Sequence, residues 1–237
     1  MIVRLLLICL GICLVSSCDS PCGLTCNQTS HKCTNPEEQT ANHLSANPQM
    51  LQQIPTGKIS LFDGKNMGKW KTTDFTNHSN VYIKDNSLIL QQGERLTGVT
   101  WTGEVPSNNY EINLDAMRLD GSDFFCGLTF PFDETFLTFV VGGWDGVVCG
   151  ISSIDHFDAS DNETTVKTYL ENNRWFHIRV LVTSGRVQCW IDDKQYVDLE
   201  TEGKHLGIRR DVRESTPLGI ASFRCSSAIR NITLTTL

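Results

Sequence analysis

The fold is decided by one stretch, YEINLDAMRL, which occupies residues 110–119. Apolar and polar side chains alternate through it, and a period of two is typical of a β-strand with one face in a core. Glu111, Asn113 and Asp115 are then expected on the opposite, polar face of this strand. The stretch therefore predicts a sheet that buries one face.

Similar runs recur on both sides of this strand, with turn residues between them. Val81–Ile83 and Leu88–Leu90 flank a four-residue turn, and Trp175–Thr183 meets Arg186–Ile191 across Ser184-Gly185, so each pair predicts a hairpin. Further runs lie at Phe124–Phe130, Phe136–Val141, Val147–Ile151, Gln195–Leu199, Leu218–Phe223 and Ala228–Thr236. Roughly a dozen short strands without a long helix predict an all-β fold, a two-sheet antiparallel sandwich.

The first 17 residues are predicted to be an export signal. Arg4 precedes the apolar run Leu5–Val15, which is too short to span a bilayer comfortably. The sequence Val15-Ser16-Ser17-Cys18 resembles a bacterial lipobox, in which the cysteine is acylated. We therefore expect an exported lipoprotein that is anchored to a membrane through Cys18. Ordinary cleavage nearby, which would give a freely soluble exported protein, is the alternative.

Residues 18–56 are predicted to be a tether between this anchor and a domain at 57–237. The segment has few large apolar residues, so it cannot bury enough surface to offset its ordering entropy. Cys18, Cys22, Cys26 and Cys33 lie in it, but their spacing lacks the C-x2-C pairs of zinc ribbons. A disulfide or a plain linker is therefore favoured over a metal site.

Composition excludes some functions for the whole chain. Its 237 residues include 27 acidic and 20 basic side chains, a net charge of −7 that argues against nucleic-acid binding. No later stretch is long and apolar enough to make the protein polytopic. Four of the 10 cysteines, namely Cys126, Cys149, Cys189 and Cys225, fall in or beside the predicted strands, and at least two of them are expected to be free and buried.

Several motifs resemble one family. SLFDGKNMGKW at residues 60–70 is similar to the "LFDGK…W" opening of the 3-keto-disaccharide hydrolase domain family. Residues 110–118 resemble its "F-E-x-x-x-E-x-R" strand, and residues 217–220 with 229–232 resemble its terminal "GPIGLQ…FRNI". The resemblance covers about residues 57–237 and implies a concanavalin A-like jelly roll.

The resemblance implies a hydrolase of 3-keto-glycosides. A ketone at C3 acidifies the proton on C2, so a base can remove it, the substituent on C1 is expelled, and water then adds. Such a site also needs a group that stabilises the enolate, a role that a metal ion can take. Two family features are missing: the chain has Ile220-Ala221-Ser222-Phe223 in place of the "LQ-x-H" segment, and Phe125-Cys126-Gly127 in place of Asn-Ser-Gly.

The candidate catalytic residues are Asp115 and Asp145 as the base and Arg118 as an enolate-stabilising cation. For each of these residues a solvated surface or a structural ion pair is the alternative. Trp144 follows two glycines and is expected to stack on a sugar ring, whereas Trp101, Trp175 and Trp190 are expected to pack in the sandwich. The full set of expected substrate-binding residues is Trp144, Asp123, Asp155, Asp158, Asn162 and Arg230.

The segment 154–163 is the richest polar loop. Asp155, Asp158 and Glu163 are expected ligands if the loop binds a divalent metal such as Ca²⁺, which prefers oxygen ligands. A sugar-binding loop and a merely solvated loop are the alternatives. We expect one binding face that combines the Asp115 strand, the turn 142–146 and this loop.

Three functions remain open at this point. The first is a hydrolase or lyase of 3-keto-glycosides. The second is a non-catalytic carbohydrate-binding module of the same fold, and the third is a cell-surface interaction domain. The fold alone does not choose among them.

Overall fold

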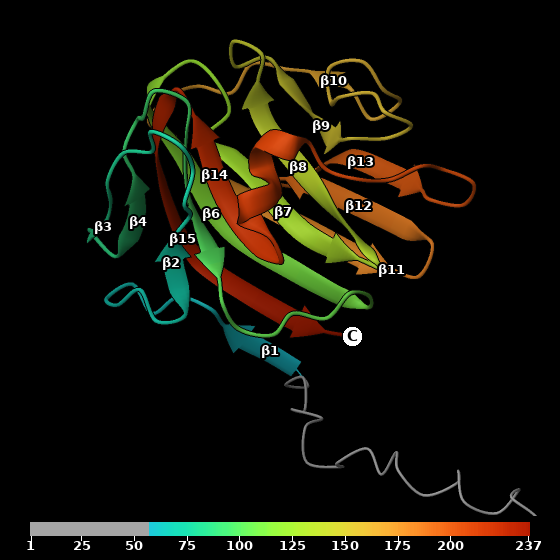
Figure 1. The fold of residues 1–237 in the computed structure, drawn as a ribbon, viewed down its shortest axis with the longest axis horizontal. Coiled ribbons are helices and arrows are strands. Elements are labelled where there is room, and N and C mark those ends of the chain that lie inside the picture. Colours follow the sequence, from blue (N-terminus) through green and yellow to red (C-terminus); the bar gives the residue numbers. More distant parts are fainter. Residues whose placement is uncertain (1–56) are drawn as a thin grey trace, which may run out of the picture. The chain divides into compact units, whose positions relative to one another are not determined.

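Two antiparallel sheets make up the part of the chain that the computed structural model describes, residues 57–237 (Figure 1). The prediction of an all-β two-sheet sandwich is confirmed. The predicted export signal at 1–17, the tether at 18–56 and the lipidation site Cys18 lie outside the described residues and stay predictions. No helix within the described range is long and apolar enough to cross a membrane.

The eight-stranded sheet has the order β13-β12-β11-β6-β15-β4-β3, and β1 pairs with β15 beside this path. Its strands are β1 (Gly57–Ser60), β3 (Val81–Lys84), β4 (Ser87–Leu90), β6 (Tyr110–Gly121), β11 (Phe176–Thr183), β12 (Arg186–Ile191), β13 (Lys194–Glu200) and β15 (Cys225–Thr236). The first described strand, β1, begins at Gly57.

The seven-stranded sheet has the order β10-β9-β8-β7-β14-β5-β2. Its strands are β2 (Trp70–Thr72), β5 (Leu96–Trp101), β7 (Cys126–Phe132), β8 (Thr135–Gly143), β9 (Val148–Ser152), β10 (Val166–Lys167) and β14 (Leu218–Phe223). The short 3₁₀ helix η2 (Arg210–Ser215) contacts β5 and β14 and lies against this sheet in Figure 1.

The main core fills the space between the two sheets. In β6, residues Ile112 and Leu114 are fully buried, and Phe139 and Val141 of β8 belong to the same apolar cluster. Glu111, Asn113 and Asp115 alternate with these core positions and are only partly buried. The prediction that these three polar side chains share the outer face of one strand is confirmed.

The opening motif has a structural role. The carboxylate of Asp63 accepts hydrogen bonds from the backbone N–H groups of Lys65 and Asn66, both at 2.7 Å, and these bonds lower the pKa of Asp63 to about 2. Trp70 donates its indole N–H to the carbonyl of Leu61 and packs against Trp101, with ring centroids 5.3 Å apart. The motif thus closes one end of the sandwich.

Two of the three tryptophans expected inside the sandwich lie outside it. Trp101 is buried, but Trp175 and Trp190 are only partly buried on the polar side of the eight-stranded sheet. The guanidinium groups of Arg230 and Arg179 cover their rings at 3.9 and 3.6 Å. Because Cys189 and Ile191 occupy the core positions of β12, alternation places Trp190 on the other face.

Cys126, Cys149, Cys189 and Cys225 are all buried with free thiols. The prediction that at least two of them are free is confirmed. Burial raises the pKa of Cys149 to about 11 and that of Cys225 to about 12. These thiols therefore stay protonated near neutral pH and behave as small apolar side chains.

Candidate functional site

A pocket opens on the outer face of the seven-stranded sheet. Thr138 and Val140 of β8 line it, because Phe139 and Val141 point the other way, into the core. The cavity has a volume of about 280 Å³. We call it the Trp144 pocket, and it is lined by Arg95, Leu96, Asp123, Phe124, Thr138, Val140, Trp144, Ser152, Arg209, Asp211, Val212 and Phe223.

Apolar side chains give the pocket part of its wall. Phe124 and Phe223 stack with ring centroids 5.8 Å apart and an angle of 20° between their planes. Both rings pack on a second apolar cluster, formed by Phe75, Leu96, Val212 and Ala221 on this side of the sheet. The pocket therefore combines an apolar surface with the polar groups around it.

The turn 142–146 presents Trp144 at the pocket. Gly142 and Gly146 have φ of +73° and +84°, a region that glycine adopts without a steric cost. A Cβ at Gly142 would lie 2.6 Å from Arg118 Nη2, and one at Gly146 would lie 2.8 Å from the carbonyl oxygen of Ser122. Both glycines are therefore needed, and they leave the Trp144 side chain 38% exposed.

The buried side chain of Arg118 supports the turn 142–146 from the core side. Its side chain lies on the core side of β6 and the residue is 2% exposed. Nη1 donates to the carbonyl oxygen of Leu170 at 3.0 Å and to Asn172 Oδ1 at 2.9 Å. Nε donates to the carbonyl oxygen of Asp123 at 3.0 Å, and Nη2 donates to the carbonyl oxygen of Gly142 at 3.4 Å. The expected role as an enolate-stabilising cation needs contact with substrate, whereas this buried guanidinium instead ties three loops together.

Ion pairs form one side of the pocket. Asp211 contacts Arg95 at 3.2 Å and Arg209 at 3.6 Å. Arg209 also donates to Asp158, and the Ser152 hydroxyl donates to the same carboxylate at 3.0 Å. Asp158, one of the expected substrate-binding residues, therefore lies next to the pocket and orients one of its arginines.

Two further expected residues belong to this region. Asp123 lines the pocket, and one of its carboxylate oxygens accepts the backbone N–H of Phe124 at 2.7 Å. Within residues 57–237, no Lys, Arg or His forms an ion pair with Asp123. Asp145 is exposed at the tip of the Trp144 turn with a φ of +58°.

The other residues of the polar loop have separate partners. Asn162 donates to the carbonyls of Ile151 and Asp158, both at 2.8 Å, so its amide organises the loop. Asp155 accepts the backbone N–H of His205, and Glu163 pairs with Lys204 at 2.6 Å. In the described part of the chain, no group of three His, Cys, Asp or Glu side chains is placed to hold a metal ion.

Asp115 lies in a different network, on the outer face of the eight-stranded sheet. Its carboxylate lies 2.9 Å from His177 Nδ1 and accepts hydrogen bonds from Asn231 at 2.7 Å and Arg230 at 3.4 Å. Burial raises the pKa of Asp115, but the hydrogen bonds from His177, Asn231 and Arg230 outweigh burial and lower it. Both carboxylate oxygens are thus engaged in ion pairs and hydrogen bonds.

The structure therefore divides the expected site residues between the two outer faces. Trp144, Asp123 and Asp158 come together at the pocket, with Asp145 beside Trp144 and Arg118 beneath them. Asp115 and Arg230 lie on the opposite side of the sandwich, so the expected single face including the Asp115 strand is not formed. The reason is that β6 belongs to the eight-stranded sheet, whereas the Trp144 turn extends from the other sheet.

Sequence reasoning missed several residues of the pocket. Arg209, Asp211 and Val212 come from the segment that contains η2, and Arg95 precedes β5. The dense charge in RRDVRE at residues 209–214 is the one sequence signal that marked this segment. Nothing local indicated that it crosses the outer face of the sheet.

The two packed antiparallel sheets place the described residues in the jelly-roll class of domain. A search of curated proteins found no match. The model of one family, the 3-keto-alpha-glucoside-1,2-lyase-like domain, matches residues 57–235. The chain belongs to this family, and its function is carbohydrate-related.

Solved structures share the fold at low sequence identity. A proposed glycosyl hydrolase from Parabacteroides distasonis is 15% identical with a TM-score of 0.50, and the match covers 76% of this chain and 94% of that one. The Crh5 transglycosylase without ligand is 9% identical with a TM-score of 0.51, covering 76% and 85%. At such identity these similarities show the fold alone.

Proposed function

We propose that the Trp144 pocket binds a sugar ring. The observation that carries this proposal is the partly exposed indole of Trp144, which a glycine-dependent turn holds at the pocket. Aromatic faces stack on the C–H face of a sugar ring, and nearby charged side chains can hydrogen-bond its hydroxyl groups. Membership of a family named for a glucoside lyase supports the same ligand class.

The arginines at the pocket do not favour an anionic ligand. Arg95 and Arg209 are both paired with carboxylates, namely Asp211 and Asp158. Neither arginine is therefore left as an unbalanced cation that would select an anionic group. A neutral polyhydroxylated molecule can use these donors and acceptors without disturbing the ion pairs.

The binding proposal is tested by titrating the full chain with trehalose, lactose and their 3-keto forms, with calorimetry as the measurement. Trp144→Ala should abolish binding and Trp144→Phe should retain part of it, because the phenyl ring keeps an aromatic face. Tyr82→Ala removes a similarly exposed aromatic side chain from β3 and serves as the control. Equal affinity of Trp144→Ala and the wild type would refute the proposal.

A second candidate function is catalysis at this pocket, on a 3-keto-glycoside. Asp123 supports it, because its carboxylate lines the pocket and forms no ion pair with a Lys, Arg or His side chain among residues 57–237. In this scheme the carboxylate takes the C2 proton, the C1–O bond breaks, and the departing oxygen takes a proton from solvent. Water then adds at C1 and a proton returns to C2, so the net reaction is hydrolysis.

Turnover separates the two candidates. Loss of a general base costs about 10²–10⁴-fold in rate, so Asp123→Asn should lower turnover of 3-keto-trehalose or 3-keto-lactose by that factor while binding persists. Asp145→Asn, made alongside, tests the other carboxylate beside Trp144. A wild-type chain that binds these sugars and releases no product is a carbohydrate-binding module, which would contradict the catalytic candidate.

A further inference from the structure

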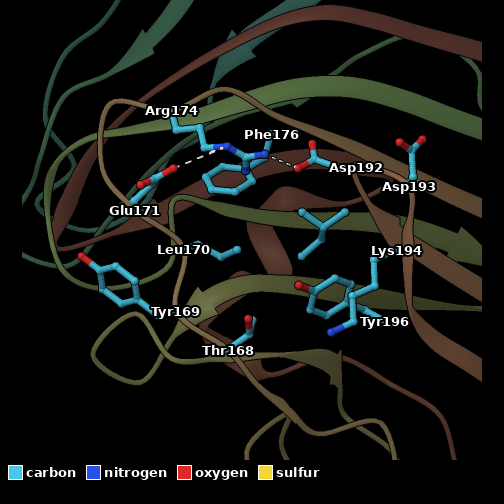
Figure 2. A pocket seen from close by; sticks show the side chains of 11 residues that line it. Thr168, Tyr169, Leu170, Glu171, Arg174, Phe176, Asp192, Asp193, Lys194 and Tyr196 are labelled. Atoms are coloured by element: carbon cyan, nitrogen blue, oxygen red, sulfur yellow. Dashed lines mark hydrogen bonds and ion pairs between the residues drawn. The ribbon is translucent and has the colours of Figure 1, made fainter.

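A second surface groove lies at one end of the sandwich and has no lining residue in common with the Trp144 pocket. Its volume is about 830 Å³, within the usual range of about 300–1,000 Å³ for ligand sites. One wall is the segment 168–174, and the other is the hairpin between β12 and β13 (Figure 2). We call this cavity the Tyr169 groove.

Aromatic side chains stand on both sides of the groove. Figure 2 shows Tyr169 on one wall and Tyr196 on the other, with Leu170 between them. Tyr169 is 73% exposed, the highest value among the exposed large apolar and aromatic side chains of the described residues. Because this ring makes little contact with the rest of the domain, it remains available to a ligand in the groove.

The wall that carries Tyr169 is anchored to the body of the domain. The carbonyl oxygen of Leu170 accepts the hydrogen bond from buried Arg118 at 3.0 Å, and the backbone N–H of Thr168 donates to the carbonyl of Val147 at 2.9 Å. Both neighbours of Tyr169 are therefore fixed while its own ring stays exposed. A preformed wall reduces the entropy that a ligand loses on binding.

The charged groups of the groove nearly balance one another. Arg174 lies over the ring of Phe176 at 4.2 Å and contacts Asp192 at 2.7 Å and Glu171 at 3.5 Å, as Figure 2 shows. Asp193 and Lys194 add one charge of each sign to the same wall. With three carboxylates and two cations the lining carries a net charge of −1, so an anionic ligand has no matching field and a cationic ligand has only a weak one.

We propose that the Tyr169 groove is a second binding site of this protein, for a neutral oligosaccharide. Sugar hydroxyl groups both donate and accept hydrogen bonds, so they match a lining with carboxylates, an ammonium and tyrosine hydroxyls. The C–H face of a sugar ring matches the exposed ring of Tyr169. The Tyr196 ring, which is partly buried and has the Lys194 ammonium over it at 5.0 Å, offers its hydroxyl group to the groove instead. The groove's size accommodates a chain of sugar units, and the site does not depend on the proposed function of the Trp144 pocket.

The test uses the full chain and four neutral probes: cellotetraose, xylotetraose, maltotetraose and laminaritetraose. Spermine and tetragalacturonate are the cationic and anionic comparisons. At least one neutral tetrasaccharide should bind with a dissociation constant of about 1 mM or lower, as measured by calorimetry. Tyr169→Ala should weaken this binding roughly tenfold or more, since an exposed stacking partner is lost without disturbing the core.

Two matched variants make the result decisive. Tyr82→Ala removes an exposed tyrosine from β3 and should leave the affinity unchanged. In the Trp144→Ala chain the first pocket no longer contributes, so tetrasaccharide binding that persists there reports the groove, whose lining does not include Trp144. Binding that Trp144→Ala abolishes and Tyr169→Ala preserves would overturn the inference while supporting the first pocket. Binding of only a charged probe, or of no tetrasaccharide, would overturn it as well.

Discussion

Replacing Arg118 by Met is expected to destabilise the domain and to loosen the loops on both binding surfaces. The guanidinium donates to four acceptors, and two of these bonds, to the carbonyl oxygens of Leu170 and Gly142, are fully buried at 3.0 and 3.4 Å. The bonds to Asp123 and Asn172 lie closer to solvent, so water can replace them. The cost of the substitution therefore comes mainly from the two buried carbonyls.

A buried acceptor left without a donor costs about 1–3 kcal/mol, so the two carbonyls together cost about 2–6 kcal/mol. The 3.4 Å bond to Gly142 is long, which favours the lower part of that range. The substitution also removes a buried charge, whose desolvation destabilises the folded state. Because Met occupies similar space without this desolvation cost, part of the loss in stability is offset. The expected net loss in the free energy of unfolding is about 2–4 kcal/mol.

Urea unfolding of the full chain measures this loss, from the midpoint and the slope of the transition. Arg186→Met is the matched control, because Arg186 is 42% exposed and pairs with Asp198 on the outer strands. An exposed ion pair contributes little to stability because water and salt screen it, so the control should change little. A loss of less than about 1 kcal/mol in Arg118→Met would refute the reasoning that the buried carbonyls depend on Arg118.

Two further predictions concern the same two faces of the sandwich. Gly142→Ala should lower the melting temperature more than Gly185→Ala. Both glycines have positive φ, but a Cβ at Gly142 would lie 2.6 Å from Arg118 Nη2, whereas a Cβ at Gly185 would have no neighbour within 4 Å. Similar losses in the two variants would argue against the contact with Arg118. Asp115→Asn should destabilise the domain most near neutral pH. The pKa of Asp115 is lowered in the folded protein, so its carboxylate stabilises the fold at any pH above the ordinary value of 3.8. This stabilisation is lost as the pH falls through the lower pKa of the folded state. Urea unfolding over a pH series checks this, and a difference from the wild type that grows toward acid would contradict it.

Local patterns predicted the strands that have one polar face. Residues 110–119 alternate because β6 lies between the core and solvent, and the hairpin at residues 84–87 was recognisable because Asp85 and Asn86 adopt the positive φ that the turn requires. By contrast, β5 (Leu96–Trp101) is buried on both faces for most of its length. Its sequence, LTGVTW, has neither alternation nor the dense apolar run that marked β7 and β9, so sequence reasoning missed it.

Sequence reasoning singled out some residues that lie at the pocket, but not the assembly that they form. Trp144 between glycines marked the turn correctly, and Asp123 and Asp158 were expected as binding residues. Asp211 pairs both with nearby Arg209 and with Arg95, which is more than a hundred residues away in the sequence. No local pattern reveals the contact with Arg95. The same limit explains Asp115: alternation gives the face of its strand, but not which sheet that strand joins.

The composition of the pocket bears on which of the two functions it performs. At the segment where the family resemblance implies Gln and His, β14 of this chain carries Ala221, which is fully buried, and Phe223, which lines the pocket. Neither position therefore offers a polar group: Phe223 adds apolar surface to the pocket, and Ala221 is buried in the second apolar cluster. Binding by stacking on Trp144 does not need them, because an apolar wall favours the C–H face of a ring. Elimination does need an acid or a base, so any chemistry here depends on Asp123 and its neighbours, with β14 contributing shape alone.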